Sequence, residues 1–140
     1  IDGNTICEAD HLFATRLWQN NSKVHFDINA REDKKRLIYG GHIISLVRAL
    51  SFNGLENAQL IVGINGGTHA NPVFAEDTIY CWSEVLDKID LNVRNIAALR
   101  LRSVGTKEKN HNMRLKSDDG KYLPTIVLDF DYWVLVPREL

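Results

Sequence analysis

The most constraining feature of the sequence is one strongly apolar helical pattern that opens on two glycines. The stretch RLIYGGHIISLVRAL runs from Arg36 to Leu50, and its apolar residues leave little polar face between them. The pattern stops at Asn53-Gly54, two residue types that favour the end of a helix. Because such a helix needs burial on nearly every side, the rest of the fold has to enclose it.

Four strands are predicted after this helix, where β-branched and aromatic residues cluster and the period changes. They span residues 59–65, 77–89, 96–107 and 125–136. One buried helix followed by long antiparallel strands predicts an α+β fold in which the sheet wraps around the helix, the hot-dog architecture. An open edge and surplus apolar strand residues such as Ile79 and Trp133 predict that a second copy of the fold covers the sheet.

A shorter helix is predicted before the apolar one, from about Cys7 to Trp18. The residues Thr5-Ile6-Cys7-Glu8 have the form of a capping box, and Leu12, Phe13 and Leu17 follow at helical spacing. The end of this helix leads into a polar loop that carries His25. Between the last two strands, the polar residues 108–122 predict a long mobile loop.

Length and charge favour a single domain that binds a small molecule or another protein. The 140 residues, of which 44% are hydrophobic, suit one domain over residues 1–140. Seventeen basic residues against eighteen acidic ones argue against nucleic acid or an anionic membrane as partner. No apolar run reaches the roughly 18 residues that cross a bilayer, and no signal segment begins the chain, so a cytoplasmic protein is expected.

Motifs for metal, nucleotide or disulfide chemistry are not found in the sequence. Cys7 and Cys81 lie far apart without metal-ligand spacing, so reduced thiols are expected. A phosphate-binding loop and paired His/Cys ligands are also missing, so no metal and no separate cofactor are expected. The chain begins at Ile1 instead of methionine, which leads us to expect that part of a longer protein precedes it.

Four segments of the sequence resemble the MaoC-like (R)-specific enoyl-CoA hydratase family of hot-dog proteins. They are TRLWQNNSKVHFD, RLIYGGHIISLVRALSFNGLENA, INGGTHANPVFAEDTIY and VLDFDYWVLVPR. The resemblance implies a hydro-lyase that reversibly hydrates an enoyl-CoA thioester, with mesaconyl-CoA and β-methylmalyl-CoA as the expected pair and coenzyme A as part of the substrate. It is strongest to the C-terminal half of members twice this length, which implies a second hot-dog domain, either an N-terminal half or another copy.

The resemblance places the chemistry on His25 and on the two glycines of the apolar helix. His25 stands where the family has its acid/base histidine, and an imidazole can take and return a proton near neutral pH. Gly41 matches the family glycine whose backbone N–H stabilises the enolate-like oxygen at a helix N-terminus. Gly40, where many relatives have histidine, is expected to lie beside the substrate.

The sequence departs from the family pattern beside His25. The family has an aspartate five residues earlier, whereas this chain has Asn20, which can orient water or the imidazole but cannot take a proton. Asp27 is then a candidate to assist His25. His69, in the segment GGTHANP, is a candidate to reach a substrate carboxylate or the thioester tail, and a structural role for it is equally open.

Other functions remain open at this point. An (R)-specific hydratase of unbranched enoyl-CoA substrates would use the same residues. A non-catalytic hot-dog half that binds acyl groups is a second alternative, against which the presence of both His25 and Gly41 argues. Hydrolysis of an acyl-CoA thioester on the same fold would need a carboxylate near the helix start, and the stretch LIYGGHIISL contains none.

Overall fold

The computed structural model describes residues 2–58, 60–93, 95–109 and 113–138. Two short 3-10 turns, Lys23–His25 and Ile28–Ala30, join the first two helices. The remaining elements in chain order are β1 (Asn4–Thr5), α1 (Glu8–Leu17), α2 (Gly40–Leu50), α3 (Phe52–Leu55), β2 (Leu60–His69), β3 (Thr78–Val93), β4 (Ile96–Thr106) and β5 (Ile126–Pro137).

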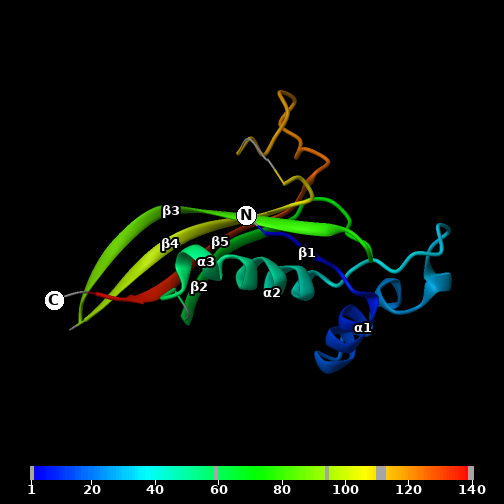
Figure 1. Ribbon diagram of the computed structural model, residues 1–140, viewed down its shortest axis with the longest axis horizontal. Coiled ribbons are helices and arrows are strands. Elements are labelled where there is room, and N and C mark those ends of the chain that lie inside the picture. The colour runs from blue at the N-terminus through cyan, green and yellow to red at the C-terminus, as the bar shows by residue number, and fades with distance from the viewer. Residues whose placement is uncertain (1, 59, 94, 110–112, 139–140) are drawn as a thin grey trace.

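The strands form one sheet in the order β1-β3-β4-β5-β2, and every neighbouring pair is antiparallel. The long strands pass over α2, while α1 lies beyond the N-terminal end of α2 (Figure 1). Strand β2 lies at an edge of the sheet, hydrogen-bonded to β5. The predicted α+β arrangement of an antiparallel sheet against one central helix is therefore confirmed.

Helix α2 packs on the sheet at a position where a strand has no side chain. A β-carbon at Gly105 would lie 2.8 Å from Val47 Cγ2 and 3.2 Å from Val127 Cγ2, so the helix approaches β4 as closely as glycine allows. Ile43 and Val47 are the buried residues of the helix. The core that surrounds them includes Ile6, Ile38, Ile79, Leu101, Leu128, Phe130, Tyr132 and Val134.

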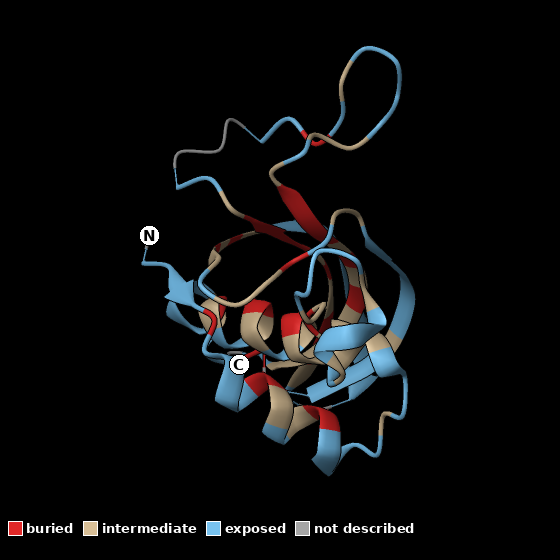
Figure 2. Cartoon of the chain, turned by 90° about the vertical axis from the view of Figure 1, so that its right-hand side faces the viewer, coloured by how far each residue is buried: buried red, intermediate tan, exposed pale blue. Residues whose placement is uncertain are grey.

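Helix α2 is less enclosed than its sequence predicted. Ser45 and Ala49 are exposed, and most other residues of the helix are half-buried. In Figure 2 the buried residues gather between the strands and the helices, whereas much of the outer strands is exposed. A single sheet covers one side of the helix, so the expected burial on nearly every side is not reached within this chain.

The N-terminal helix turns a different face inward from the one that its apolar spacing suggested. His11 and Thr15 are its buried residues, while Phe13 and Leu17 are 66% and 61% exposed. The predicted capping box is wrong, because the Thr5 hydroxyl lies in β1 and hydrogen-bonds the Thr78 hydroxyl at 2.7 Å. The short strand β1 thus contains the residue that the sequence pattern assigned to the cap of the helix.

Strand β2 is longer than predicted. It continues to His69 instead of ending near residue 65, because its backbone stays paired with β5 through two register shifts, at Ile61/Gly63 and Ile64/Gly66. Such bulges accept glycine, and Gly63 and Gly66 lie at these two shifts. The extension places His69 at the end of a strand, where its backbone is fixed.

The connection between β4 and β5 is partly folded. Residues 110–112 of the predicted mobile loop lie outside the described residues. In the remainder, Lys116 forms an isolated bridge with Tyr122, and Leu115 is buried with Val104 and Ile126. This part of the predicted loop therefore has a small core of its own.

The structure also bears on the expectations for thiols and membranes. Cys7 is exposed, Cys81 is buried, and both are free. Burial raises the pKa of the Cys81 thiol to about 11. Within the described ranges, no helix has the length and apolar character needed to cross a membrane.

The contact between α2 and Gly105 predicts that Gly105→Ala lowers the free energy of unfolding by about 2 kcal/mol, the usual cost of overpacking a core. Urea unfolding followed by tryptophan fluorescence measures this change. Gly54→Ala is the matched control, because a β-carbon there meets nothing within 4 Å and alanine favours a helix. Equal unfolding midpoints for the two variants would contradict the proposed packing.

Candidate active site

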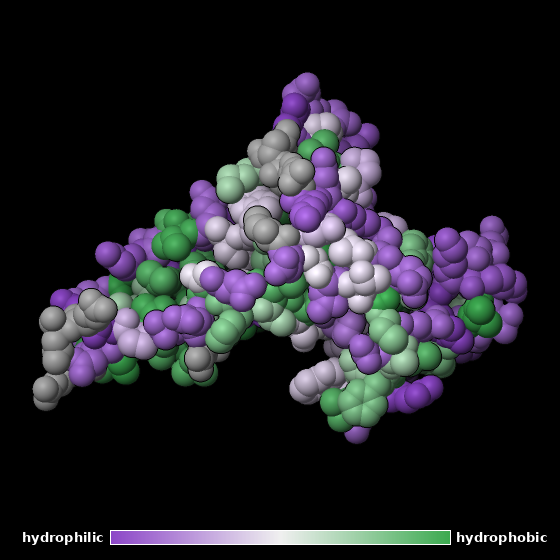
Figure 3. Space-filling model, in the orientation of Figure 1, coloured by the Kyte–Doolittle hydropathy of each residue, from purple (hydrophilic) through white to green (hydrophobic). Residues whose placement is uncertain are grey.

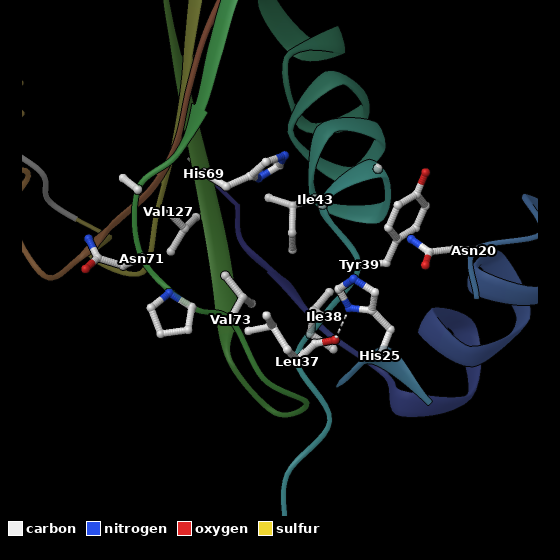
Figure 4. Close-up of a pocket in the computed structure, with 14 residues that line it drawn as sticks. Asn20, His25, Leu37, Ile38, Tyr39, Ile43, His69, Asn71, Val73 and Val127 are labelled. Atoms are coloured by element: carbon white, nitrogen blue, oxygen red, sulfur yellow. Dashed lines mark hydrogen bonds between the residues drawn. The ribbon is translucent and has the colours of Figure 1, made fainter. Parts of the chain in front are cut away.

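A pocket of about 560 Å³ opens between the start of α2 and the end of β2. It brings together five of the six residues that the sequence singled out, namely Asn20, His25, Gly40, Gly41 and His69. Figure 4 shows Asn20 and His25 from the segment after α1 and His69 from the end of β2 lying around the start of α2. The remaining lining is mostly apolar and comprises Leu37, Ile38, Tyr39, Ile43, Ala70, Asn71, Pro72, Val73 and Val127.

His25 is held by a hydrogen bond that selects its tautomer. Its Nδ1 lies 2.8 Å from the backbone carbonyl oxygen of Leu37. Because a carbonyl oxygen only accepts, Nδ1 carries the proton and donates it, and Nε2 of the neutral ring is left as an acceptor. The same ring packs edge-on against Tyr39, with 5.8 Å between the centroids. His25 therefore presents an unprotonated nitrogen to the pocket in a fixed orientation.

Asn20 is also fixed, and its amide nitrogen donates to no residue in the described ranges. Its Oδ1 accepts a hydrogen bond of 2.9 Å from the backbone N–H of Ser22. In Figure 4 the Asn20 amide lies on the side of the His25 ring that faces away from the Leu37 carbonyl. The arrangement lets Asn20 donate a hydrogen bond to a water or substrate oxygen beside His25, without taking a proton itself.

The start of α2 offers backbone donors to the same pocket. The Tyr39 carbonyl accepts hydrogen bonds from the backbone N–H groups of His42 and Ile43. Gly40 and Gly41 precede them as the first two residues of the helix, where backbone N–H groups have no acceptor within the helix. The Tyr39 side chain makes no capping hydrogen bond. The N–H groups of Gly40 and Gly41 and the positive end of the helix dipole are thus placed to stabilise an oxyanion.

Asp27 and Asn71 have structural partners. An oxygen of Asp27 accepts from the Asn29 N–H at 2.8 Å and caps the second 3-10 turn, and the residue does not line the pocket. The amide of Asn71 donates to the carbonyl oxygens of Leu123 and Ile126. Support for His25 from Asp27 remains a prediction that this geometry does not favour.

His11 is a residue of the site region that the sequence interpretation missed. It is completely buried, and neither ring nitrogen has a hydrogen-bond partner in the described structure. Its ring packs edge-on against His25 with 6.2 Å between the centroids, and lies 6.3 Å from that of His42. Its spacing of four residues from Thr15 was the available signal for an inward polar face.

Nowhere in the described ranges are three or more His, Cys, Asp or Glu side chains grouped to hold a metal ion.

Burial, followed by the nearby His42 and His25, lowers the pKa of His11 from 6.5 to about 4. The folded chain therefore stays neutral at this position where the unfolded chain takes up a proton, so stability falls as the pH decreases from 6.5 to about 4.

His11→Leu should abolish up to about 3 kcal/mol of this pH dependence, the equivalent of the pKa difference. Denaturant unfolding at pH 8 and at pH 4.5, for the unaltered chain and for the variant, measures it. Parallel pH dependence in the two proteins would show that His11 titrates normally in the folded state.

Comparison with known proteins finds two curated relatives that match nearly the whole of this chain. It is 59% identical over 138 residues to a mesaconyl-CoA hydratase of Cereibacter sphaeroides, covering 99% of this chain and 40% of that protein. It is 52% identical over 144 residues to a β-methylmalyl-CoA dehydratase of Chloroflexus aurantiacus, covering 99% of this chain and 41% of that protein. The chain thus spans about two-fifths of the length of the curated relatives it matches. No family model matches the chain.

Solved structures agree with this relationship. A MaoC domain dehydratase of Chloroflexus aurantiacus superposes with a TM-score of 0.94 at 50% identity, covering all of this chain and 41% of that one. A double hot-dog protein of Mycobacterium tuberculosis superposes with a TM-score of 0.70 at 14% identity, covering 99% of this chain and 40% of that one. The predicted hot-dog fold is confirmed. The chain is a close homologue of one part of the mesaconyl-CoA hydratase and β-methylmalyl-CoA dehydratase chains.

Proposed function

We propose that this chain is the catalytic hot-dog half of a hydro-lyase that reversibly hydrates an enoyl-CoA thioester. The observation that carries the proposal is the orientation of His25, whose Nδ1–H is bound to the Leu37 carbonyl while Nε2 is an acceptor in the pocket. A fixed base opposite unpaired backbone donors is the arrangement that addition of water to a conjugated thioester requires.

The proposed reaction uses His25 for both proton transfers. Nε2 of His25 removes a proton from water as the water oxygen bonds to the β-carbon of the substrate. The electron pair of the carbon–carbon double bond then forms a new double bond to the thioester carbon, and the carbonyl pair moves onto the oxygen. Backbone N–H groups of Gly40 and Gly41 stabilise that oxyanion. Transfer of the proton from the imidazolium to the α-carbon restores the thioester.

The names of the two relatives support mesaconyl-CoA as the substrate and β-methylmalyl-CoA as the product. Unbranched enoyl-CoA is the alternative substrate class, since the same base and donors would serve it. Hydration rates with mesaconyl-CoA and with an unbranched enoyl-CoA of similar length separate the two classes. The pocket would hold the acyl group against apolar side chains such as Ile38, Val73 and Val127.

A second hot-dog domain is part of the proposal. Apolar atoms gather at the end of the sheet opposite α1 and over α1 itself (Figure 3). We call the first of these areas the sheet-end patch, and it comprises the exposed residues Leu60, Ile61, Val62 and Ile64 of β2 with Val85, Leu86, Ile89, Leu91 and Val93 of β3. Strands β2 and β3 lie on opposite sides of β4 and β5, and exposed apolar surface along such outer strands favours contact with another chain or domain.

The position of this patch differs from what the sequence suggested. Ile79 is completely buried within the chain, so it is not part of a surface for a partner. The relatives are long enough to hold a second domain of this size, and a hot-dog partner would cover both the β2 edge and the open side of α2. The partner is proposed to be either the remaining part of such a longer protein or a second copy of this chain.

Substitution of His25 tests the proposed base. His25→Asn keeps an N–H that can donate to the Leu37 carbonyl but removes the base, so kcat for hydration should fall by about 10²–10⁴-fold while the fold is retained. Steady-state rates with mesaconyl-CoA and thermal unfolding of the same samples measure this. A kcat within threefold of the unaltered enzyme would refute the assignment.

Substitution within the sheet-end patch tests the partner. Ile64 is 65% exposed, so Ile64→Lys should leave the fold intact but weaken association. If the partner is a second copy, light scattering should show a mass above 15.9 kDa for the unaltered chain and a smaller average mass for the variant; if it is the rest of a longer protein, the variant should bind that separately produced part more weakly. Met113→Lys, at a residue that is 66% exposed and outside the patch, is the control. A stable 15.9 kDa monomer that hydrates mesaconyl-CoA unaided would exclude the two-domain proposal.

A further inference from the structure

The imidazole of His69 occupies the space that a side chain at position 40 would fill. A β-carbon on Gly40 would lie 2.5 Å from His69 Nε2, 2.8 Å from Cε1 and 3.0 Å from Cδ2. The tip of the ring therefore packs against the first residue of α2, and any larger residue at position 40 would displace it. Figure 4 shows the ring extending from the end of β2 toward the start of the helix. Glycine at position 40 is required by this histidine.

The backbone holds His69 firmly in this position. His69 pairs with Leu128 of β5, and the backbone N–H of the following residue, Ala70, donates to the Val127 carbonyl oxygen at 3.1 Å. Its ring nitrogens make no hydrogen bond to any other residue in the described ranges, although the side chain lines the pocket. A rigidly placed imidazole with both nitrogens available faces the same space as the unpaired N–H groups of α2.

The surroundings keep this imidazole uncharged. Partial burial lowers the pKa of His69 below its ordinary value. The positive end of the α2 dipole also disfavours a cation at this place. A neutral imidazole cannot attract an anion as a cation would, but it can donate one N–H to an oxygen that gains negative charge during the reaction.

We propose that His69 is a catalytic residue of the hydration reaction, whose Nε2–H donates a hydrogen bond to the thioester oxygen together with the backbone N–H groups at the start of α2. The inference rests on the proposed function and gives the oxyanion a side-chain donor opposite His25. Because the hydrogen bond strengthens as the enolate-like charge develops, His69 acts on kcat more than on substrate binding.

Two substitutions of His69 separate donation from space filling. His69→Phe retains a ring against Gly40 but removes the donor, so kcat should fall by about 10²-fold with KM changed less than threefold. His69→Gln keeps an N–H and should recover at least tenfold of that loss. Both are measured in the active assembly with mesaconyl-CoA, and equal thermal midpoints verify that the variants are folded.

Gly40→Ala tests the contact itself. The added methyl should displace the imidazole and lower kcat by about tenfold in the unaltered enzyme, but by less than threefold in the His69→Phe background. Such non-additivity shows that Gly40 acts through His69. His42→Phe is the matched control, because His42 belongs to the same first turn but does not line the pocket. The kcat of this variant should differ from that of the unaltered enzyme by less than threefold.

The results distinguish failure of this inference from failure of the proposed function. A His69→Phe enzyme with unaltered kcat, in an assembly that His25→Asn inactivates, overturns the role of His69 alone. If kcat/KM falls equally in the Phe and Gln variants because KM rises while kcat is unaltered, His69 only binds the substrate in its ground state. That result also overturns the proposal. An unaltered assembly that hydrates no enoyl-CoA overturns the function on which the inference rests.

Discussion

The packing of α2 against the sheet at Gly105 is the contact on which the rest of the site depends. Val47 and Val127 leave no room for a side chain there, so the helix axis is fixed at a short distance from β4. The N-terminal end of the helix is then held beside the end of β2 and beside the segment that follows α1. One packing contact therefore sets the positions of the backbone donors, His69 and His25 relative to one another.

Local hydrogen bonds refine what this contact positions. The Leu37 carbonyl lies three residues before Gly40, so the same short segment that leads into α2 also selects the tautomer of His25. Asn20 is held by the Ser22 N–H in a similar way. The orientation of His25 therefore comes from a backbone carbonyl and needs no carboxylate beside the ring. His11 packs behind the base as an uncharged ring.

The sequence predicted those parts that depend on local pattern. The apolar period of α2, the β-branched residues of β4 and the glycine pair at the helix start are local signals, and each element formed where it was expected. Asn20, His25, Gly40 and Gly41 were named from the resemblance, which transfers positions one by one, and His69 was named from its segment GGTHANP. All five converge on one pocket. Asp27 was named by proximity in sequence alone, and its side chain caps a turn instead.

Features that depend on distant contacts were not predictable from local pattern. Apolar spacing in α1 pointed to Phe13 and Leu17, yet His11 faces inward, because the inward face is chosen by what the helix packs against. The contact of His69 with Gly40 joins two segments that meet only once β2 extends beyond its bulges. The exposed α1 residues and the sheet-end patch are apolar residues that the described part of the chain leaves largely uncovered, which fits the proposed second hot-dog domain.

Nitrogen NMR of the histidine side chains in the active assembly tests directly whether His25 presents an unprotonated Nε2 to the substrate. The Nδ1 signal of His25 should be that of a protonated nitrogen, and Nε2 should give the signal of an unprotonated one. Addition of a non-reactive enoyl-CoA analogue should shift the Nε2 signal and leave Nδ1 unchanged. A spectrum in which Nε2 carries the proton, or one in which the analogue perturbs neither nitrogen, would contradict the assignment of His25 as the base.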